Sequence, residues 1–147
     1  MISVLVVDDN GPVRKSLRDL LEMADDIKLV ATARNGLEAV EKARSYRPDV
    51  AVMDISMPLM DGLEATQHIR ECCRLTRVII VSGFNDPEYV KRALEVGAKG
   101  YVLKEAAAND LLEGIRRVHQ GKHYFSHQIA ELAEKYLPGR GNDSWAV

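Results

Sequence analysis

Five short runs of apolar, largely β-branched residues recur along the chain, and each has the length of a β-strand. They occupy residues 2–7, 28–33, 50–53, 78–81 and 101–103. Polar and apolar residues do not alternate regularly within these runs, which is typical of strands that helices cover on both faces of a parallel sheet. The runs therefore favour an α/β fold.

Between the runs, apolar residues recur at the spacing of amphipathic helices. Pro12 and Pro87 suit the first turns of two such helices, and Gly97 and Gly121 can end helices in left-handed geometry. Strands and helices that alternate in this way predict a doubly wound parallel sheet of five strands, in the order 2-1-3-4-5, with helices on both faces. We expect this fold to fill residues 1–122 as one domain.

Residues 123–147 are expected to form a C-terminal segment of a different kind. One more amphipathic helical stripe is present there, formed by Ile129, Leu132, Ala133, Tyr136 and Leu137. Proline, glycine and polar residues dominate positions 138–144, which is typical of a linker or tail.

Composition narrows the function classes. The 147 residues are 46% hydrophobic and 29% charged, which suits one globular core. The net charge of −2 provides no overall positive field for nucleic acid or an anionic membrane. The apolar runs are too short to span a bilayer, and no charged leader precedes an apolar segment, so we expect a cytoplasmic protein without a membrane partner.

Polar residues end four of the five apolar runs. Asp8 and Asp9 follow the first run, Asp54 the third, Ser82 the fourth and Lys104 the fifth. In an open parallel sheet, ligands bind beyond the carboxyl ends of the strands, and the first and third strands are neighbours in the predicted order. Three carboxylates would then meet and raise one another's pKa unless a cation intervenes, and an all-oxygen ligand set suits Mg²⁺.

Lys104 and Ser82 add groups that can bind an anion. An ammonium and a hydroxyl both suit the oxygens of a phosphoryl group held against the metal. Taken singly, an aspartate at a strand end is more often the cap of the next helix, and a lysine there is more often solvated. Capping does not account for the joint placement of all five residues, so we interpret them as a functional site.

Four motifs in this order resemble the receiver domain of two-component response regulators. They are Val-Leu-Val-Val-Asp-Asp at residues 4–9, Val-Met-Asp-Ile-Ser-Met-Pro-Leu-Met-Asp-Gly at 52–62, Ile-Ile-Val-Ser-Gly at 79–83, and Gly-Ala-Lys-Gly-Tyr-Val-Leu-Lys at 97–104. The match covers residues 1 to about 120. The resemblance implies a flavodoxin-like or CheY-like fold.

The resemblance also implies a phosphoacceptor and a metal site. Asp54 would accept the phosphoryl group. Asp9, Asp54 and the backbone carbonyl of Ser56 would hold Mg²⁺, and Asp8 would act through metal-bound water.

Three further roles follow from the same family. Lys104 would pair with a phosphoryl oxygen, and Ser82 would close onto another. Tyr101 would be an aromatic switch that turns inward once Ser82 moves. Many receivers have proline after this lysine, whereas Glu105 follows here, so we expect a trans peptide at this point.

Residues 110–126 are similar to the receiver end of the NarL/FixJ, or LuxR-type, family, whose members continue into a helix-turn-helix domain. Ten residues follow Leu137, so we expect DNA binding only through a C-terminal domain that this sequence does not include. Whether the sequence is a piece of a longer regulator or a stand-alone receiver stays open.

The leading hypothesis is a phosphorylation-activated signalling switch that is not an enzyme, although it catalyses its own phosphorylation and dephosphorylation. Its partners would be a sensor histidine kinase and, after phosphorylation, a second copy of the chain; in a longer parent chain it would regulate transcription. The alternative is a Mg²⁺-dependent phosphohydrolase with an aspartate nucleophile. Hydrolases of the haloacid dehalogenase type place a second aspartate two residues after the nucleophile, whereas Asp8 and Asp9 are adjacent and followed by Asn10.

Overall fold

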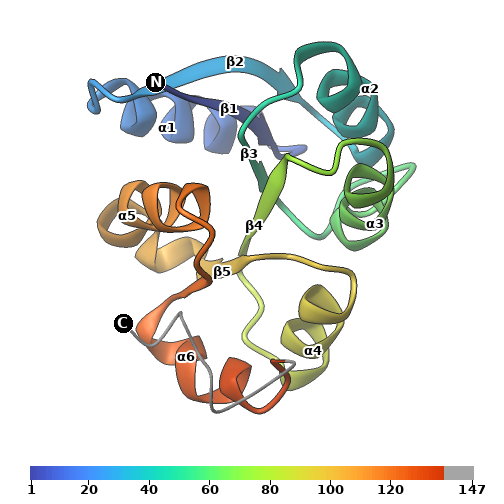
Figure 1. Ribbon diagram of the computed structural model, residues 1–147, viewed down its shortest axis with the longest axis vertical. Coiled ribbons are helices and arrows are strands. Elements are labelled where there is room, and N and C mark those ends of the chain that lie inside the picture. The colour runs from blue at the N-terminus through green and yellow to red at the C-terminus, as the bar shows by residue number, and fades with distance from the viewer. Residues whose placement is uncertain (138–147) are drawn as a thin grey trace.

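The computed structural model describes residues 1–137, and the predicted linker or tail at 138–147 lies outside this range. The described residues form an α/β fold around one parallel sheet (Figure 1). Its strands are β1 (Ile2–Val7), β2 (Ile27–Ala33), β3 (Val50–Met53), β4 (Arg77–Ser82), β5 (Gly100–Leu103) and β6 (Tyr124–Phe125). Its helices are α1 (Gly11–Glu22), α2 (Gly36–Tyr46), α3 (Gly62–Cys72), α4 (Pro87–Glu95), α5 (Ala107–His119) and α6 (His127–Glu134), with a short 3₁₀ turn, η1, at Lys104–Ala106.

The sheet has the order β2-β1-β3-β4-β5-β6, so the prediction of five strands is wrong, although the five predicted strands and their order are confirmed. The additional strand β6 pairs in parallel with β5, and the Tyr124 amide donates to the Lys99 carbonyl at 3.0 Å. Two residues are too few to show a strand period in a sequence. The division of the chain at residue 122 stays a prediction, but the sheet continues past it.

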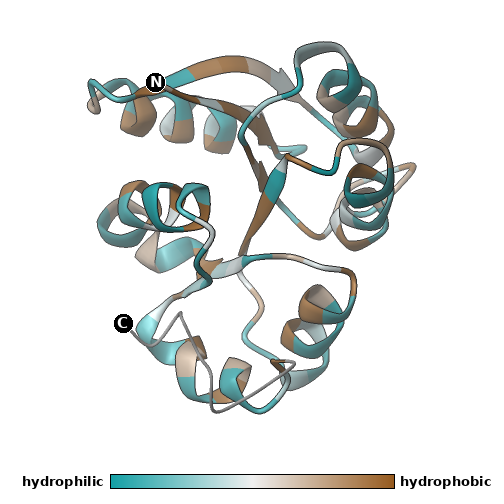
Figure 2. Ribbon diagram, viewed as in Figure 1, coloured by the Kyte–Doolittle hydropathy of each residue, from teal (hydrophilic) through white to brown (hydrophobic). Residues whose placement is uncertain are grey.

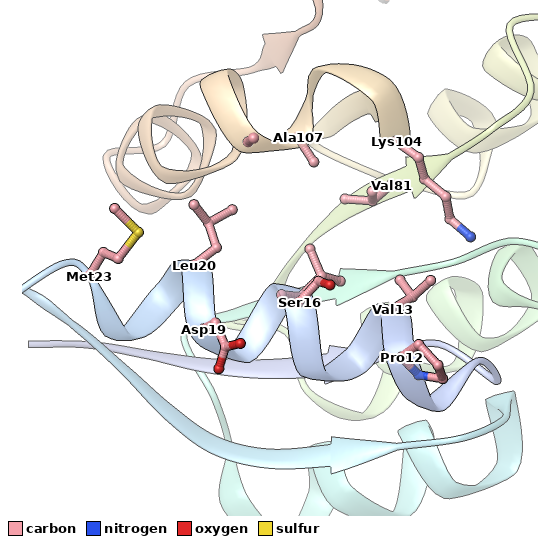
Figure 3. Close-up of a pocket in the computed structure, with 11 residues that line it drawn as sticks. Pro12, Val13, Ser16, Asp19, Leu20, Met23, Val81, Lys104 and Ala107 are labelled. Atoms are coloured by element: carbon pink, nitrogen blue, oxygen red, sulfur yellow. The ribbon is translucent and has the colours of Figure 1, made fainter.

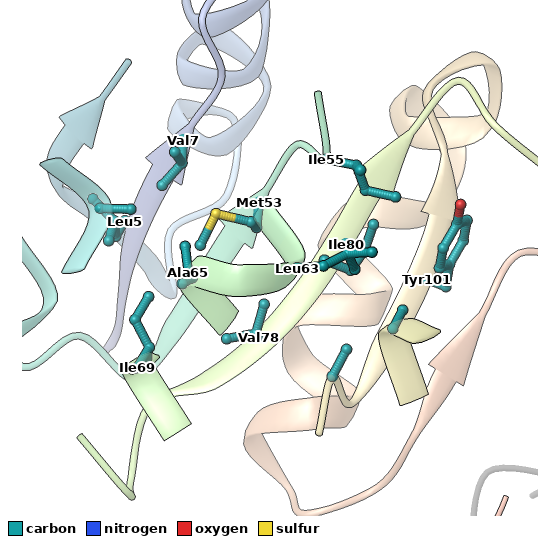
Figure 4. Packing of buried hydrophobic residues seen from close by; sticks show 14 of the residues in the cluster. Leu5, Val7, Met53, Ile55, Leu63, Ala65, Ile69, Val78, Ile80 and Tyr101 are labelled. Atoms are coloured by element: carbon teal, nitrogen blue, oxygen red, sulfur yellow. The ribbon is translucent and has the colours of Figure 1, made fainter. Parts of the chain in front are cut away.

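Helices cover both faces of the sheet, as predicted. Helices α1 and α5 pack on one face, while α2, α3, α4 and α6 pack on the other. Figure 2 shows hydrophobic residues running along the central strands and polar residues on the outer sides of the helices. Figure 4 shows how strand side chains interlock with one side of α3, through Leu5, Val7, Met53, Val78, Ile80, Leu63, Ala65 and Ile69.

Local signals in the sequence account for several helix ends. Pro12 lies in the first turn of α1, whose cap is the side chain of Asn10, which accepts from the Val13 amide at 3.0 Å. Gly97 and Gly121 end helices with φ angles of 99° and 90°, the left-handed geometry that glycine adopts without strain.

The predicted C-terminal stripe forms α6 and folds onto its own chain. Ile129 and Ala133 are fully buried, and Leu137 just beyond the helix is also buried. These side chains belong to the same apolar cluster as Val90 of α4 and Tyr101 of β5. Helix α6 therefore covers the end of the sheet formed by β5 and β6, next to α4.

None of the helices within residues 1–137 combines the length and the apolar composition needed to cross a membrane.

Candidate functional site

The carboxyl ends of β1 and β3 bring two buried aspartates together. The two strands are parallel neighbours, with Val7 opposite Met53, so Asp8 and Asp54 leave the sheet side by side. Asp8 is 1% exposed and Asp54 is 6% exposed. The Asp54 amide donates to the Val7 carbonyl at 3.0 Å, which fixes the start of the loop that follows β3.

Asp9 completes an acidic cluster. One carboxylate oxygen from each of Asp8, Asp9 and Asp54 lies within 4.8 Å of the others. Asp9 is exposed, whereas its two partners are buried. A set of oxygen ligands that is open to solvent on one side matches the preference of Mg²⁺, which keeps several of its waters when bound.

Lys104 reaches the same cluster from the end of β5. Its Nζ lies 3.2 Å from Oδ2 of Asp8 and 3.4 Å from Oδ1 of Asp54. The side chain is 35% exposed, so the ammonium lies at the border between the buried carboxylates and solvent. The peptide after Lys104 is trans, as expected.

The charges in this cluster shift the pKa values of two groups. Burial and, after it, the charge of Asp8 raise the pKa of Asp54 to about 6, although Lys104 and the Ile55 amide partly oppose these two effects. For Lys104, burial alone would lower the pKa, but the carboxylates of Asp54 and Asp8 outweigh it and raise the pKa above its usual value. The site therefore favours a bound cation beside Asp54.

Ser82 and Tyr101 are joined through one loop residue. The hydroxyl of Ser82, at the end of β4, accepts from the Phe84 amide at 3.0 Å. The Tyr101 hydroxyl donates to the Phe84 carbonyl at 2.6 Å. Both Ser82 and Tyr101 are fully buried, and burial raises the pKa of Tyr101 to about 12, so its ring already lies inward in this structure. Figure 4 shows the Tyr101 hydroxyl at the edge of the apolar cluster.

The other predicted residue, Ser56, is exposed in the loop two residues after Asp54. The structure thus brings together Asp8, Asp9, Asp54 and Lys104, while Ser56 lies in the loop after β3 and Ser82 is the last residue of the neighbouring strand β4. The metal-binding role of the Ser56 carbonyl stays a prediction.

Three residues at the site were not singled out from the sequence. The guanidinium of Arg14 donates to the Asp8 carbonyl at 2.8 Å. Gly62 begins α3 so close to the loop after β3 that a Cβ atom there would collide with the Asp54 carbonyl. Ser126 bonds the last residues of β5. Gly62 lies in the motif at residues 52–62 and could have been recognised there as a close-packing glycine. Ser126 ends the segment 110–126 that resembles the NarL/FixJ family, but nothing in that segment indicates its bonds to β5, and nothing in the sequence marks Arg14.

An apolar groove of about 610 Å³ lies beside the acidic cluster, between α1 and the start of α5. Figure 3 shows Val13 and Leu20 of α1 facing Ala107 of α5, with Lys104 at one end and Met23 at the other. Lys104 therefore borders both the acidic cluster and the groove.

Comparison with known proteins agrees with this geometry. Residues 4–116 match the family model of the response regulator receiver domain. The chain is 39% identical over 121 residues to the transcriptional regulatory protein LnrK of Bacillus subtilis, covering 82% of this chain and 55% of LnrK. It is 36% identical over 145 residues to the oxygen regulatory protein NreC of Staphylococcus aureus, covering 97% of this chain and 67% of NreC.

A solved structure of a response regulator is also similar to this chain. The crystal structure of a LuxR-family two-component response regulator from Aurantimonas sp. SI85-9A1 superposes with a TM-score of 0.87 at 32% identity, covering 92% of this chain and 96% of that one. The chain therefore belongs to the response regulator receiver domain family, and its relatives place it among the LuxR-type regulators of two-component signalling.

Proposed function

We propose that the chain is a phosphorylation-activated switch in which Asp54 accepts a phosphoryl group from a sensor histidine kinase. An oxygen of the Asp54 carboxylate attacks phosphorus while the bond from phosphorus to the histidine nitrogen breaks. The observation that carries this proposal is the contact of one ammonium, that of Lys104, with both Asp8 and Asp54. A fixed positive charge at this place stabilises the charge on the transferring phosphoryl oxygens.

The acidic cluster fits Mg²⁺ as the resident cation. Its three carboxylates offer converging oxygens, and Lys104 offsets only part of their charge. Asp9, Asp54 and the carbonyl of Ser56 would hold the ion, and Asp8 would act through a bound water. When bound, the cation would neutralise part of the negative charge that a phosphoryl group adds beside the carboxylates.

Ser82 and Tyr101 would report the modification. Once Asp54 carries the phosphoryl group, the Ser82 hydroxyl can donate to one of its oxygens. Movement of Ser82 would disturb its bond with the Phe84 amide, and the Phe84 carbonyl holds the Tyr101 hydroxyl. The surface around Tyr101 would then repack and change the contacts with partners.

The output of the switch is proposed from the relatives. LnrK and NreC are named as a transcriptional and an oxygen regulatory protein, and the chain spans 55% and 67% of their lengths. We infer that the chain regulates transcription as part of a longer protein and that phosphorylation favours a homodimer. Its net charge of −2 favours DNA contact through another domain.

Incubation with acetyl phosphate tests the assignment of the phosphoacceptor. Intact-mass measurement should show one added phosphoryl group on the wild-type chain in the presence of Mg²⁺, and none after chelation of the metal. Asp54→Asn should stay unlabelled, because an amide is a far weaker nucleophile than a carboxylate.

The matched control is Asp25→Asn, which removes an exposed carboxylate elsewhere and should be labelled as the wild type is. Equal labelling of Asp54→Asn and the wild type would contradict the assignment.

A further inference from the structure

Ser126 is a buried polar residue that the proposed mechanism does not yet use. It is fully buried at the junction of β6 and α6. Its hydroxyl accepts from the Leu103 amide at 2.9 Å, across 23 positions of the sequence. Its own amide donates to the Tyr101 carbonyl at 3.0 Å. Ser126 thus bonds to the backbone of both Tyr101 and Leu103 in β5.

The Ser126 hydroxyl acts as the hydrogen-bond acceptor for β5, a role that a backbone carbonyl of the neighbouring strand has elsewhere in the sheet. Strand β6 ends at Phe125, while β5 continues to Leu103. The Ser126 carbonyl accepts from the amides of Ile129 and Ala130, at 2.8 and 2.9 Å, and so belongs to the first turn of α6. The Ser126 hydroxyl therefore serves as the acceptor for the Leu103 amide. Without it, this buried donor would have no partner, which is energetically costly.

This arrangement differs from the ordinary role of serine before a helix. A serine at this position usually accepts from an amide in the first turn of its own helix. Ser126 makes no such side-chain bond to α6, and its hydroxyl accepts instead from the Leu103 amide of β5. Ser126 therefore both ends the hydrogen bonding of β5 and begins α6.

The bonded amide lies directly before the residue that enters the acidic cluster. Leu103 is followed by Lys104, whose ammonium contacts Asp8 and Asp54. On the other side, Ile129 of α6 packs in the same apolar cluster as Tyr101. Through Ser126, the start of α6 is thus joined to the backbone from which Lys104 extends.

We propose that Ser126 is a positioning residue that couples the docking of α6 to the placement of Lys104 at the phosphorylation site. This role rests on the proposed function of Asp54. The seating of α6 then sets how well Lys104 stabilises the transferring phosphoryl group. Because equilibrium coupling between two sites is reciprocal, the phosphorylated state in turn favours one seating of α6. The C-terminal helix is then a regulatory element of the switch.

The rate of labelling by acetyl phosphate in the full chain tests the coupling. Ser126→Ala should slow labelling of Asp54 by about fivefold or more, because a displaced Lys104 stabilises the transferring phosphoryl oxygens less well. The matched control is Thr76→Val, which removes another buried hydroxyl bond, to the Pro48 carbonyl at 2.6 Å, at the start of β4 and away from the cluster. This control should be labelled at the wild-type rate.

A double-mutant comparison separates positioning from loss of structure. If Ser126 acts through Lys104, Ser126→Ala should slow labelling no further in a Lys104→Ala background. Equal slowing in both backgrounds, or a wild-type rate for Ser126→Ala, would overturn the coupling. A wild-type chain that takes up no phosphoryl group would instead refute the proposed function, and with it this role.

Amide hydrogen exchange in the wild-type chain gives a second test that does not depend on the folding of a variant. Addition of beryllofluoride, which mimics an acyl phosphate, should change exchange at Leu103 together with Ile129 and Ala130. A response around Tyr101 without any change at Leu103 and in the first turn of α6 would overturn the proposal.

Discussion

Asp54 lies where burial and the carboxylate of Asp8 both disfavour a negative charge, and its pKa is raised to about 6. An aspartate in an unfolded chain titrates near about 3.9. Between about pH 4 and pH 6 the folded chain therefore binds more protons than the unfolded chain, so its free energy of unfolding falls as the pH rises through this window. At neutral pH the ionised Asp54 destabilises the metal-free fold by on the order of 2 kcal/mol.

Asp54→Asn should accordingly stabilise the metal-free protein at neutral pH by on the order of 2 kcal/mol, because it removes the buried charge. The advantage should shrink as the pH falls toward about 4, where wild-type Asp54 is itself neutral. Urea unfolding of both proteins across this pH range measures the difference. Asp25→Asn, at an exposed position, should change stability little at any pH, and a pH-independent gain for Asp54→Asn would contradict the assigned cause.

Ser82 should be needed for the response to phosphorylation but not for the modification. Its hydroxyl holds the Phe84 amide, and Phe84 in turn holds the Tyr101 hydroxyl, so Ser82→Ala breaks this path while leaving Asp54 in place. We expect Ser82→Ala to be labelled by acetyl phosphate, with a much smaller change in the amide NMR shifts around Tyr101. Ser45→Ala, an exposed serine of α2, should respond fully. A full response from labelled Ser82→Ala would show that another residue reports the phosphoryl group.

Helix α3 packs closely against the site, because its first residue, Gly62, lies against the backbone of Asp54. Gly62→Ala would place a methyl group against the Asp54 carbonyl and should lower the free energy of unfolding by about 2–3 kcal/mol. It should also slow labelling of Asp54. Gly11→Ala at the first residue of α1 is the matched control, since the nearest atom to its new methyl group is a flexible Arg14 nitrogen at 3.6 Å. Denaturant unfolding that gave equal losses for the two variants would contradict this packing argument.

The helices and strands differ in how well their sequences predict them. The first five strands were predicted to within one residue at each end, because each is a short and mostly apolar run. Four of them are buried on both faces, whereas β2 at the edge of the sheet is only partly buried. Strand β6 was missed, since Tyr124–Phe125 is held by pairing with β5 and has no period of its own. The stripe that forms α6 was predicted, but its packing against α4 depends on the tertiary fold and could not be read from periodicity.

At the scale of the whole molecule, the part of the candidate site that follows from the order of the strands could be predicted from the sequence. Once β1 and β3 are neighbours, Asp8 and Asp54 must meet at the carboxyl edge, and Lys104 reaches them from β5. Contacts that depend on side chains from distant segments could not be predicted. Arg14 and Ser126 contribute through single hydrogen bonds to backbone atoms, and no spacing in the sequence encodes such bonds.

At the scale of the whole molecule, we predict that the apolar groove between α1 and α5 is the face at which two copies of the chain associate. The groove between α1 and α5 leads from Lys104 to Met23, which is 77% exposed, so a change at Asp54 can reach this surface through Lys104. We predict weak self-association that phosphorylation strengthens by about 1–3 kcal/mol, with the two-fold symmetry usual for such dimers. Sedimentation velocity with and without beryllofluoride measures this change.

Met23→Glu should weaken the beryllofluoride-dependent dimer, because it places a charge on the apolar face. The matched control is Leu75→Glu, which changes an apolar side chain that is 84% exposed between α3 and β4 and should leave the dimer intact. Equal weakening by both variants would place the contact outside the groove. An unchanged monomer in both states, up to millimolar concentrations, would remove the dimer while leaving the assignment of Asp54 as phosphoacceptor unaffected, since all the groups of the proposed phosphorylation site lie within one chain.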